Sequence, residues 1–276
     1  MMDRPLFIDD QNKIGKEGFK AILKSLGIKD DDVLFVHSDV SVFGKLTTFD
    51  RSFILGSFVE VLQDTVPNGT LILPTFTYSF CNGEKFHIKN SKSTVGALTE
   101  HFRRREDVSR TRHPIFSVAI WGNKNDFLDI GKDSFDEKSI FGKLHKKNAK
   151  LLFLGAPFQS CTYMHYIEQM HGIPYRYMKY FRGKIVDNDG EHEDEYTFFV
   201  RYLDSNIDFD MEKTERYLLS NGFMKKKRLG SGEILLIEAN VLYEEGLKLL
   251  DKDIFYFLKT GPDMKKMEKQ KCRIKI

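Results

Sequence analysis

Residues 150–168 read KLLFLGAPFQSCTYMHYIE, and this alternation of apolar and polar stretches largely sets the expected topology. Residues 151–154 form a short, continuous apolar run, which is typical of a buried strand. Gly155 and Pro157 mark a loop after that strand, and residues 162–170 have helical character. A strand, a loop and a helix in this order predict an α/β fold with chemistry close to the end of the strand.

Two similar strands are expected earlier in the chain. Residues 32–37 form an apolar run that ends at His37-Ser38-Asp39, and residues 70–73 form another that ends at Pro74. Residues 48–66 between them have helical spacing. The same patterns predict further strands at 115–121, 181–186, 196–201 and 232–238, and further helices at 14–27, 95–105 and 241–258.

The domain organisation follows from length and from the absence of breaks in the sequence. A chain of 276 residues can form one large domain or two small ones, at roughly 150 residues per domain. No internal repeat or low-complexity linker interrupts the chain. We expect a single domain over residues 1–262 and a frayed, Lys-rich tail over 263–276.

Residues 75–93 are polar and aperiodic, which predicts a long loop. A loop of this length is more often functional than idle.

Composition and charge exclude several classes of protein. Hydrophobic residues make up 41% of the chain, which also has 24 Phe and 11 Tyr, too many for a disordered protein. The formal charge of +3 is too balanced to indicate a nucleic-acid or membrane partner. The small net charge conceals segments of opposite charge. Residues 187–215 have eleven acidic and two basic side chains, whereas Lys225–Arg228 is entirely basic.

The cysteines and the N-terminal sequence bear on location. Cys81, Cys161 and Cys272 are odd in number and far apart, which fits neither a disulfide framework nor a structural zinc site. No apolar run approaches the roughly 18 residues that span a bilayer, and the N-terminus has no apolar signal core. We expect a cytoplasmic protein with no membrane and no nucleic-acid partner.

His165 and Glu168 are the strongest candidates for catalysis. Three residues apart on a helix, the two side chains share one face, and they come directly after a buried strand. A histidine oriented by a carboxylate is the usual general base for an amine or hydroxyl nucleophile. A surface ion pair would show the same spacing, so spacing alone does not separate the two interpretations.

Two other segments have weaker signals. Residues 37–44 follow a strand, and their N–H groups and small hydroxyls suit phosphate oxygens, although Ser38 and Asp39 would serve equally as turn or helix caps. Arg110 and Arg112 suit phosphate or a solvated basic face. The chain lacks a P-loop, a G-x-G-x-x-G fingerprint and metal-ligand spacing, so we expect no metal.

Seven short blocks then occur in an informative order. They are residues 37–40 with Gly44, 69–77, 96–100, 112–114 with Ser117, 139–144, 151–155 with Thr162, His165 and Glu168, and 208–250. In this order the chain resembles the aminoglycoside 3-N-acetyltransferases, acetyl-coenzyme A-dependent enzymes unrelated in fold to the commoner small acetyltransferases. Each block is weak alone, but their shared order covers nearly the whole chain.

The resemblance implies an α/β fold with a central mixed sheet flanked by helices. It implies that His165, supported by Glu168, takes the proton of an acceptor amine as that amine attacks the thioester of acetyl-coenzyme A. The implied cofactor contacts are His37, Ser38, Val40, Ser41, Thr75 and Ser117. Those implied on the acceptor side are Thr77, Tyr78 and Tyr163.

The acceptor remains open at this point. It is an aminoglycoside, as in antibiotic resistance, or a nucleotide-linked amino sugar, for which Arg103–Arg105 and Arg176 would bind the diphosphate. Two departures from the family pattern are Ile140, where a proline is common, and Asp39, where a second serine is common. The alternatives are a non-catalytic relative and a hydrolase that uses Cys161 with His165. The oligomeric state, including a homodimer, is also open.

Overall fold

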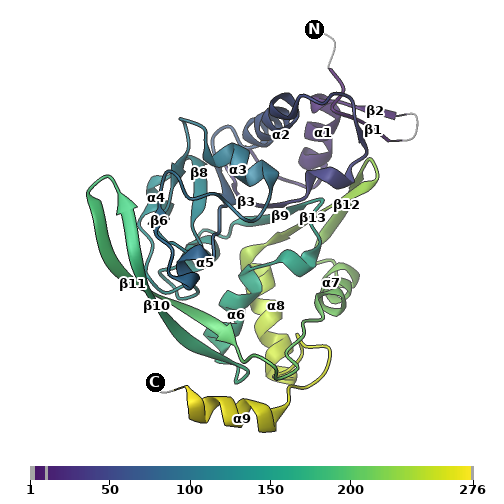
Figure 1. The fold of residues 1–276 in the computed structure, drawn as a ribbon. Helices are drawn as coiled ribbons and strands as arrows, with labels where there is room; N and C mark the ends of the chain where they lie inside the picture. The colour runs from purple at the N-terminus through teal and green to yellow at the C-terminus, as the bar shows by residue number, and fades with distance from the viewer. Residues whose placement is uncertain (1–3, 10–11, 275–276) are drawn as a thin grey trace.

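The computed structural model describes residues 4–9 and 12–274, and a seven-stranded mixed sheet organises this part of the chain (Figure 1). The strand order is β12-β13-β9-β3-β5-β8-β7. These strands are β3 (Val33–Ser38), β5 (Thr70–Pro74), β7 (Ser109–Arg110), β8 (Val118–Gly122), β9 (Lys150–Leu154), β12 (Lys225–Leu229) and β13 (Gly232–Glu238). The expected α/β class with a central mixed sheet is confirmed.

The three central strands are parallel and set the position of the site. β3 pairs in parallel with both β5 and β9, whereas β8 and β13 run antiparallel on either side. His37 lies opposite Phe153 in this register. The carboxyl ends of β3, β5 and β9 therefore meet at one edge of the sheet, where ligands of open α/β sheets usually bind.

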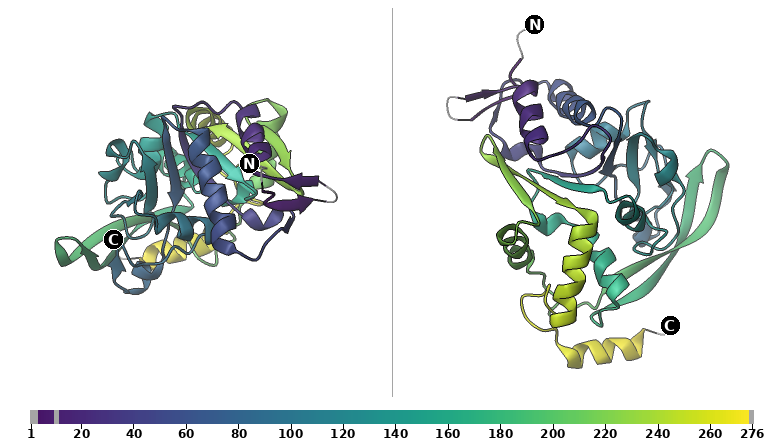
Figure 2. Two further views of the ribbon diagram at one scale, coloured as in Figure 1. Left: turned by 90° about the horizontal axis from the view of Figure 1, so that it is seen from above. Right: turned by 180° about the vertical axis from the view of Figure 1, so that it is seen from behind.

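Helices cover both faces of the sheet, as Figures 1 and 2 show. Along β3, Leu34 and Val36 belong to one apolar core and Phe35 to the other, because successive side chains point to opposite faces. On one face lie α1 (Lys16–Ser25), α2 (Arg51–Thr65) and α3 (Ala97–Arg103). On the other lie α5 (Ile140–Lys146), α6 (Tyr163–His171) and α8 (Ala239–Lys252). Burial on both faces explains the continuous apolar runs of the strands.

A long hairpin projects from the body of the molecule (Figure 1). It consists of β10 (Arg176–Asp187) and β11 (Gly190–Arg201), and β6 (Phe86–His87) joins its outer part in parallel. Much of the acidic run lies here, and basic side chains from the body hold it: Asp187 pairs with Arg112, Glu191 with Lys85 and Asp194 with Lys132. These carboxylates attach the hairpin to the body instead of forming an open acidic surface.

Several elements differ from the expectation. Lys225–Arg228 lies in the edge strand β12. Lysines are common on the unpaired edge of a sheet, and their charge removes the apolar pattern by which a strand is recognised in a sequence. α8 ends at Lys252, so residues 254–258 continue as a loop. The expected frayed tail forms α9 (Met264–Arg273), because Met267 is buried. No helix in the described ranges is long and apolar enough to cross a membrane.

The remaining elements are short or peripheral. They are β1 (Phe7–Asp9), β2 (Asn12–Ile14) and β4 (Lys45–Leu46), which form a small sheet; the short helices η1 (Val40–Val42), η2 (Ser79–Asn82), η3 (Phe158–Ser160) and α4 (Asn125–Leu128); and α7 (Met211–Ser220). η2 and β6 lie within the expected 75–93 loop, so this loop is partly structured.

Two buried histidines predict acid-sensitive stability. Burial lowers the pKa of His37 and of His113 from 6.5 to about 3. Below pH 6.5 the unfolded chain binds protons that the folded chain does not. The free energy of unfolding should therefore fall from pH 6.5 towards pH 3, by about 2 kcal/mol per histidine at pH 5.

Urea unfolding at pH 7 and pH 5 measures this loss. His113→Asn keeps an acceptor near the backbone N–H groups of Ile115 and Phe116 and should remove about 2 kcal/mol of the loss at pH 5, whereas His192→Asn, at an exposed position, should remove none. An unchanged loss in His113→Asn would show that other groups cause the acid sensitivity.

Candidate active site

The candidate site lies where the loops after β3, β5 and β9 meet. His37 and Ser38 end β3, Thr75 follows β5, and Gly155 follows β9. Thr75 N–H donates to the carbonyl of Ser117 at 2.8 Å, which brings the start of β8 to the same edge. The parallel strands gather His37, Ser38 and Thr75 at this edge, and the antiparallel pairing of β5 with β8 adds Ser117.

His165 and Glu168 contact each other, as their spacing on α6 predicts. His165 Nδ1 lies 2.7 Å from Glu168 Oε2. The Glu168 side chain is completely buried, whereas 24% of the His165 side chain is exposed. This is a buried carboxylate that orients an accessible imidazole, and it differs from a solvated surface pair.

Two further residues complete this cluster, and sequence reasoning did not assign them to it. Tyr175 Oη donates to Glu168 Oε1 at 2.8 Å. Arg176 Nε lies 2.9 Å from Glu168 Oε2, and Arg176 Nη2 lies 3.0 Å from His165 Nδ1. Both residues follow α6 closely in the chain, but their role depends on the turn at Gly172, where φ is +79°.

The contacts assign the tautomer of His165. A carboxylate oxygen only accepts hydrogen bonds, so the nitrogen that meets it must carry the hydrogen. Nδ1–H therefore donates to Glu168, and the lone pair is on Nε2. Arg176, which carries only donors, is then an electrostatic neighbour of Nδ1 and not its hydrogen-bond donor.

The charges in the cluster favour a neutral imidazole. Burial first, and then the charge of Arg176, lower the pKa of His165 against the opposing effect of Glu168. Burial alone would raise the pKa of Glu168, but Arg176, His165 and Tyr175 together hold it below its ordinary value. Near neutral pH, Glu168 is ionised and His165 is neutral, which is the state that a general base requires.

A cavity of about 450 Å³ opens beside His165. Six of the residues that line it are Gln159, Cys161, His165, Arg176, Arg201 and Phe209. A second cavity, of about 610 Å³, shares Gln159, Arg201, Phe209 and Met211 with the first. Its further lining residues are all charged: Asp208, Asp210, Glu212, Arg216 and Lys259. The two cavities therefore adjoin each other at Gln159, Arg201, Phe209 and Met211.

The loop after β3 contains unsatisfied polar atoms. The ring of His37 stacks on Phe153 with the centroids 5.1 Å apart. His37 Nε2 and Ser38 Oγ are buried without a hydrogen-bond partner in the described residues. Buried polar atoms normally have partners, so these two are candidates to meet a ligand.

The same loop packs closely against the end of β9. Gly155 has φ +72°, and a Cβ there would lie 2.2 Å from the carbonyl oxygen of Asp39. The Asp39 carboxylate accepts from Ser41 N–H at 3.0 Å, so it caps η1. Asp39, the acidic residue that departs from the family pattern, therefore forms its hydrogen bond within its own loop.

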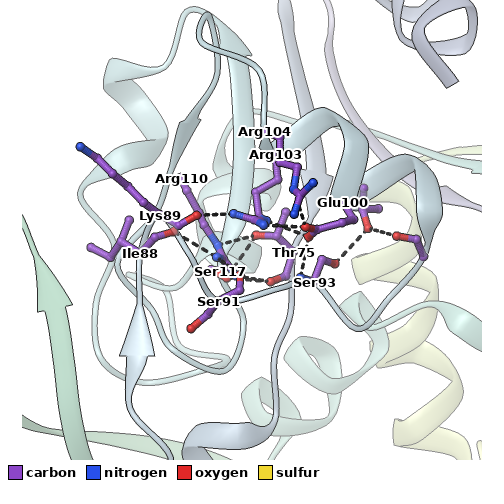
Figure 3. Close-up of polar contacts among 12 residues, drawn as sticks. Thr75, Ile88, Lys89, Ser91, Ser93, Glu100, Arg103, Arg104, Arg110 and Ser117 are labelled. Carbon is purple, nitrogen blue, oxygen red and sulfur yellow. Dashed lines mark hydrogen bonds and ion pairs between the residues drawn. The ribbon is translucent and has the colours of Figure 1, made fainter. Parts of the chain in front are cut away.

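Thr75 and Ser117 contact a partly buried arginine, Arg110, as Figure 3 shows. Arg110 Nε lies 3.1 Å from both hydroxyl oxygens, and its Nη2 donates to the carbonyl of Thr75 at 2.7 Å. Arg110 Nη1 donates to the carbonyls of Ser91 and Ile88. No carboxylate of the described residues pairs with Arg110, and burial lowers its pKa to about 9.

The other arginines of this region are occupied. Arg103 and Arg104 both pair with Glu100 (Figure 3), and Arg105 pairs with Asp107. Arg176 is paired with Glu168. The groups considered for a diphosphate are thus engaged by carboxylates within the chain.

The remaining candidates lie further from the cavity beside His165. Thr77 is buried and lies near Ser79, with their hydroxyl oxygens 3.2 Å apart, and Tyr78 is partly exposed. Tyr163 is fully buried against Tyr166. None of the three lines either described cavity.

Cys161 lines the cavity as a protonated thiol, because burial raises its pKa to about 12, and a thiol is a poor nucleophile. Across the described ranges, no group of three or more His, Cys, Asp or Glu side chains is arranged to hold a metal ion.

Comparison with known sequences gives a consistent family match. The model of a family described as aminoglycoside 3-N-acetyltransferase matches residues 35–251. Aminoglycoside N(3)-acetyltransferase IV of Salmonella sp. is 26% identical over 269 residues, which cover 91% of this chain and 92% of that protein. The prophage-derived aminoglycoside N(3')-acetyltransferase-like protein YokD of Bacillus subtilis (strain 168) is 28% identical over 58% of this chain. That match spans 66% of the relative, just under two thirds.

Solved structures share the fold. A structure described as AAC-IIIb in a binary complex with CoASH has a TM-score of 0.75 at 22% identity, covering 90% of this chain and 98% of its own. The apoenzyme of the aminoglycoside acetyltransferase AAC(3)-IVa has a TM-score of 0.73 at 21% identity, covering 98% of both chains. At these identities the likeness establishes the arrangement of the backbone.

Proposed function

Because the chain belongs to the aminoglycoside 3-N-acetyltransferase family, we propose that it transfers an acetyl group from acetyl-coenzyme A to an amine of an aminoglycoside. The resemblance inferred from the sequence is confirmed, and with it the class of enzyme, an acetyl-coenzyme A-dependent acyltransferase. The observation that carries the proposal for this chain is the contact of 2.7 Å between His165 and buried Glu168 at the wall of a cavity.

His165 acts as the general base in the proposed reaction. The amine nitrogen attacks the thioester carbonyl carbon, and His165 Nε2 takes the proton that this nitrogen loses. The carbon–nitrogen bond forms, the carbon–sulfur bond breaks, and the proton returns from Nε2 to the departing thiolate of coenzyme A. Glu168 stabilises the transient imidazolium through Nδ1–H, as an ionised partner should. No covalent enzyme intermediate is needed.

Acetyl-coenzyme A would bind at the edge formed by the loops after β3 and β5. We assign this role to His37, Ser38, Val40, Ser41, Thr75 and Ser117. The unpartnered His37 Nε2 and Ser38 Oγ support it. Thr75 and Ser117 are fully buried and hydrogen-bonded to each other and to Arg110, so they would support this edge from behind. Arg110 also places a positive charge without a paired carboxylate behind that edge, which would favour an anionic cosubstrate.

Family membership and the pairing of the arginines favour an aminoglycoside over a nucleotide-linked sugar. The second cavity has both signs of charge in its wall: Asp208, Asp210 and Glu212 would attract ammonium groups, and Arg201, Arg216 and Lys259 line the same cavity. The arginines that a diphosphate would require are paired with carboxylates. Thr77, Tyr78 and Tyr163 lie outside both cavities, so their contribution to acceptor binding would be indirect.

We place the reaction in the cytoplasm. Cys81, Cys161 and Cys272 are all within the described residues and all free, as a reducing compartment would leave them.

Replacing His165 tests the base. His165→Gln should lower kcat by a hundredfold or more, because general-base catalysis contributes roughly 10²–10⁴. Coenzyme A should stabilise the variant against heat as much as it stabilises the wild type. A loss of activity below tenfold would show that another group is the base.

Blocking the loop after β3 tests the cofactor site. Ser41 is exposed, so Ser41→Trp should leave folding intact while its ring fills the proposed pyrophosphate position. The rise in melting temperature with coenzyme A should then shrink, while Ser220→Trp, on the exposed end of α7, should keep the full rise. Equal shifts in both variants would remove the loop from the site.

A thiol-release assay tests the acceptor. The wild type is incubated with acetyl-coenzyme A and either an aminoglycoside or a nucleotide-linked amino sugar, with His165→Gln as the matched control. We expect release with the aminoglycoside alone. Release with the nucleotide sugar alone would overturn the assigned acceptor, and release with neither would favour a non-catalytic relative.

A further inference from the structure

Arg176 is held against the His165–Glu168 pair from several directions. It is the first residue of β10, and 4% of its side chain is exposed. Its Nη1 donates to the carbonyl of Phe199 on β11 at 2.9 Å, and its guanidinium carbon lies 5.2 Å from the ring centroid of Phe209. The hairpin therefore fixes the guanidinium beside α6.

We propose that Arg176 is a positioning residue that keeps Glu168 ionised and His165 neutral, with Nε2 open to a substrate proton. This role rests on the proposed function of His165 as the base. The arginine acts through the pair and needs no contact with a substrate. It would therefore determine the pH range in which the enzyme works.

Glu168 needs the positive charge of Arg176 because its carboxylate is buried. An ionised carboxylate with no exposed surface is very unfavourable unless cations and donors surround it. Arg176 supplies the cation, and Tyr175 Oη donates to the other carboxylate oxygen at 2.8 Å. Without the guanidinium, Glu168 would compete with His165 for a proton, and the pair would hold one more proton near neutral pH.

The charged and titratable groups around His165 determine whether its imidazole is neutral or protonated. They are Glu168 on α6, Arg176 on β10, Arg201 on β11 and the protonated thiol of Cys161 before α6, with the uncharged rings of Phe135 and Phe209 against the imidazole. Two cations and one carboxylate thus face the ring. Loss of one cation makes the imidazolium more favourable and should raise the pKa of His165.

The test compares three variants by two readouts. Arg176→Met removes the charge and keeps an apolar stem; Arg176→Lys keeps the charge. Arg182→Met makes the same change at an exposed position on the same strand, where the arginine pairs with Glu195. The first readout is NMR titration of the labelled His165 ring, assigned with His165→Gln. The second is the acid limb of kcat/KM for acetyl transfer.

In Arg176→Met, we expect the titration midpoint of His165 to rise by about one pH unit. The fraction of free base on the acid limb then falls about tenfold, and the loss disappears at higher pH. Arg176→Lys and Arg182→Met should titrate like the wild type. A midpoint that is unchanged in folded Arg176→Met, with lower activity at every pH, would show a merely structural role and overturn the proposal.

The two readouts distinguish a failure of the proposed role of Arg176 from a failure of the proposed acetyl transfer. The NMR midpoint needs no turnover, so it tests Arg176 even if no acceptor is acetylated. If Arg176→Met does not fold, Arg176→Gln and Arg176→Lys provide the comparison of a neutral with a charged side chain, and equal midpoints in those two would contradict the proposal.

Discussion

A fully buried carboxylate is the constraint around which the site is assembled. Glu168 lies within contact distance of an imidazole, a phenol and a guanidinium, which come from α6, from the turn after it and from β10. No one of these partners would make the ionised group tolerable in a dry interior. The helix and the hairpin must therefore pack together, and the base is positioned by the same contacts that join the first residue of the hairpin to α6.

The parts of the site that sequence could predict depend on local geometry. Three residues along a helix always share a face, so the contact between His165 and Glu168 follows from spacing once α6 is recognised. The buried strands were recognisable because both of their faces are covered. Arg176 could not be predicted in the same way, since its contact with His165 requires the turn at Gly172 and the docking of the hairpin.

Of the sequence features, the charge pattern was the poorest guide to the structure. The acidic run and the basic clusters suggested separate regions of opposite charge, yet carboxylates of the acidic run pair with basic side chains far away in the chain: Asp187 with Arg112, and Asp194 with Lys132. Asp208, Asp210 and Glu212 of the acidic run do line the second described cavity, but Arg201, Arg216 and Lys259 line it with them. A linear count of charges cannot distinguish a carboxylate that attaches a hairpin from one that faces a ligand, because the partners are distant in the chain.

The charged edge strand β12 has a consequence for assembly. Lys225, Lys226 and Lys227 lie along one end of the main sheet, and the other end is β7, which is two residues long. A second copy that added its own strand beside β12 would align like charges across the junction, and β7 offers too few backbone groups to pair. Growth into a continuous intermolecular sheet is thereby disfavoured at both edges, so self-association of this protein would have to use a surface other than the edges of its main sheet.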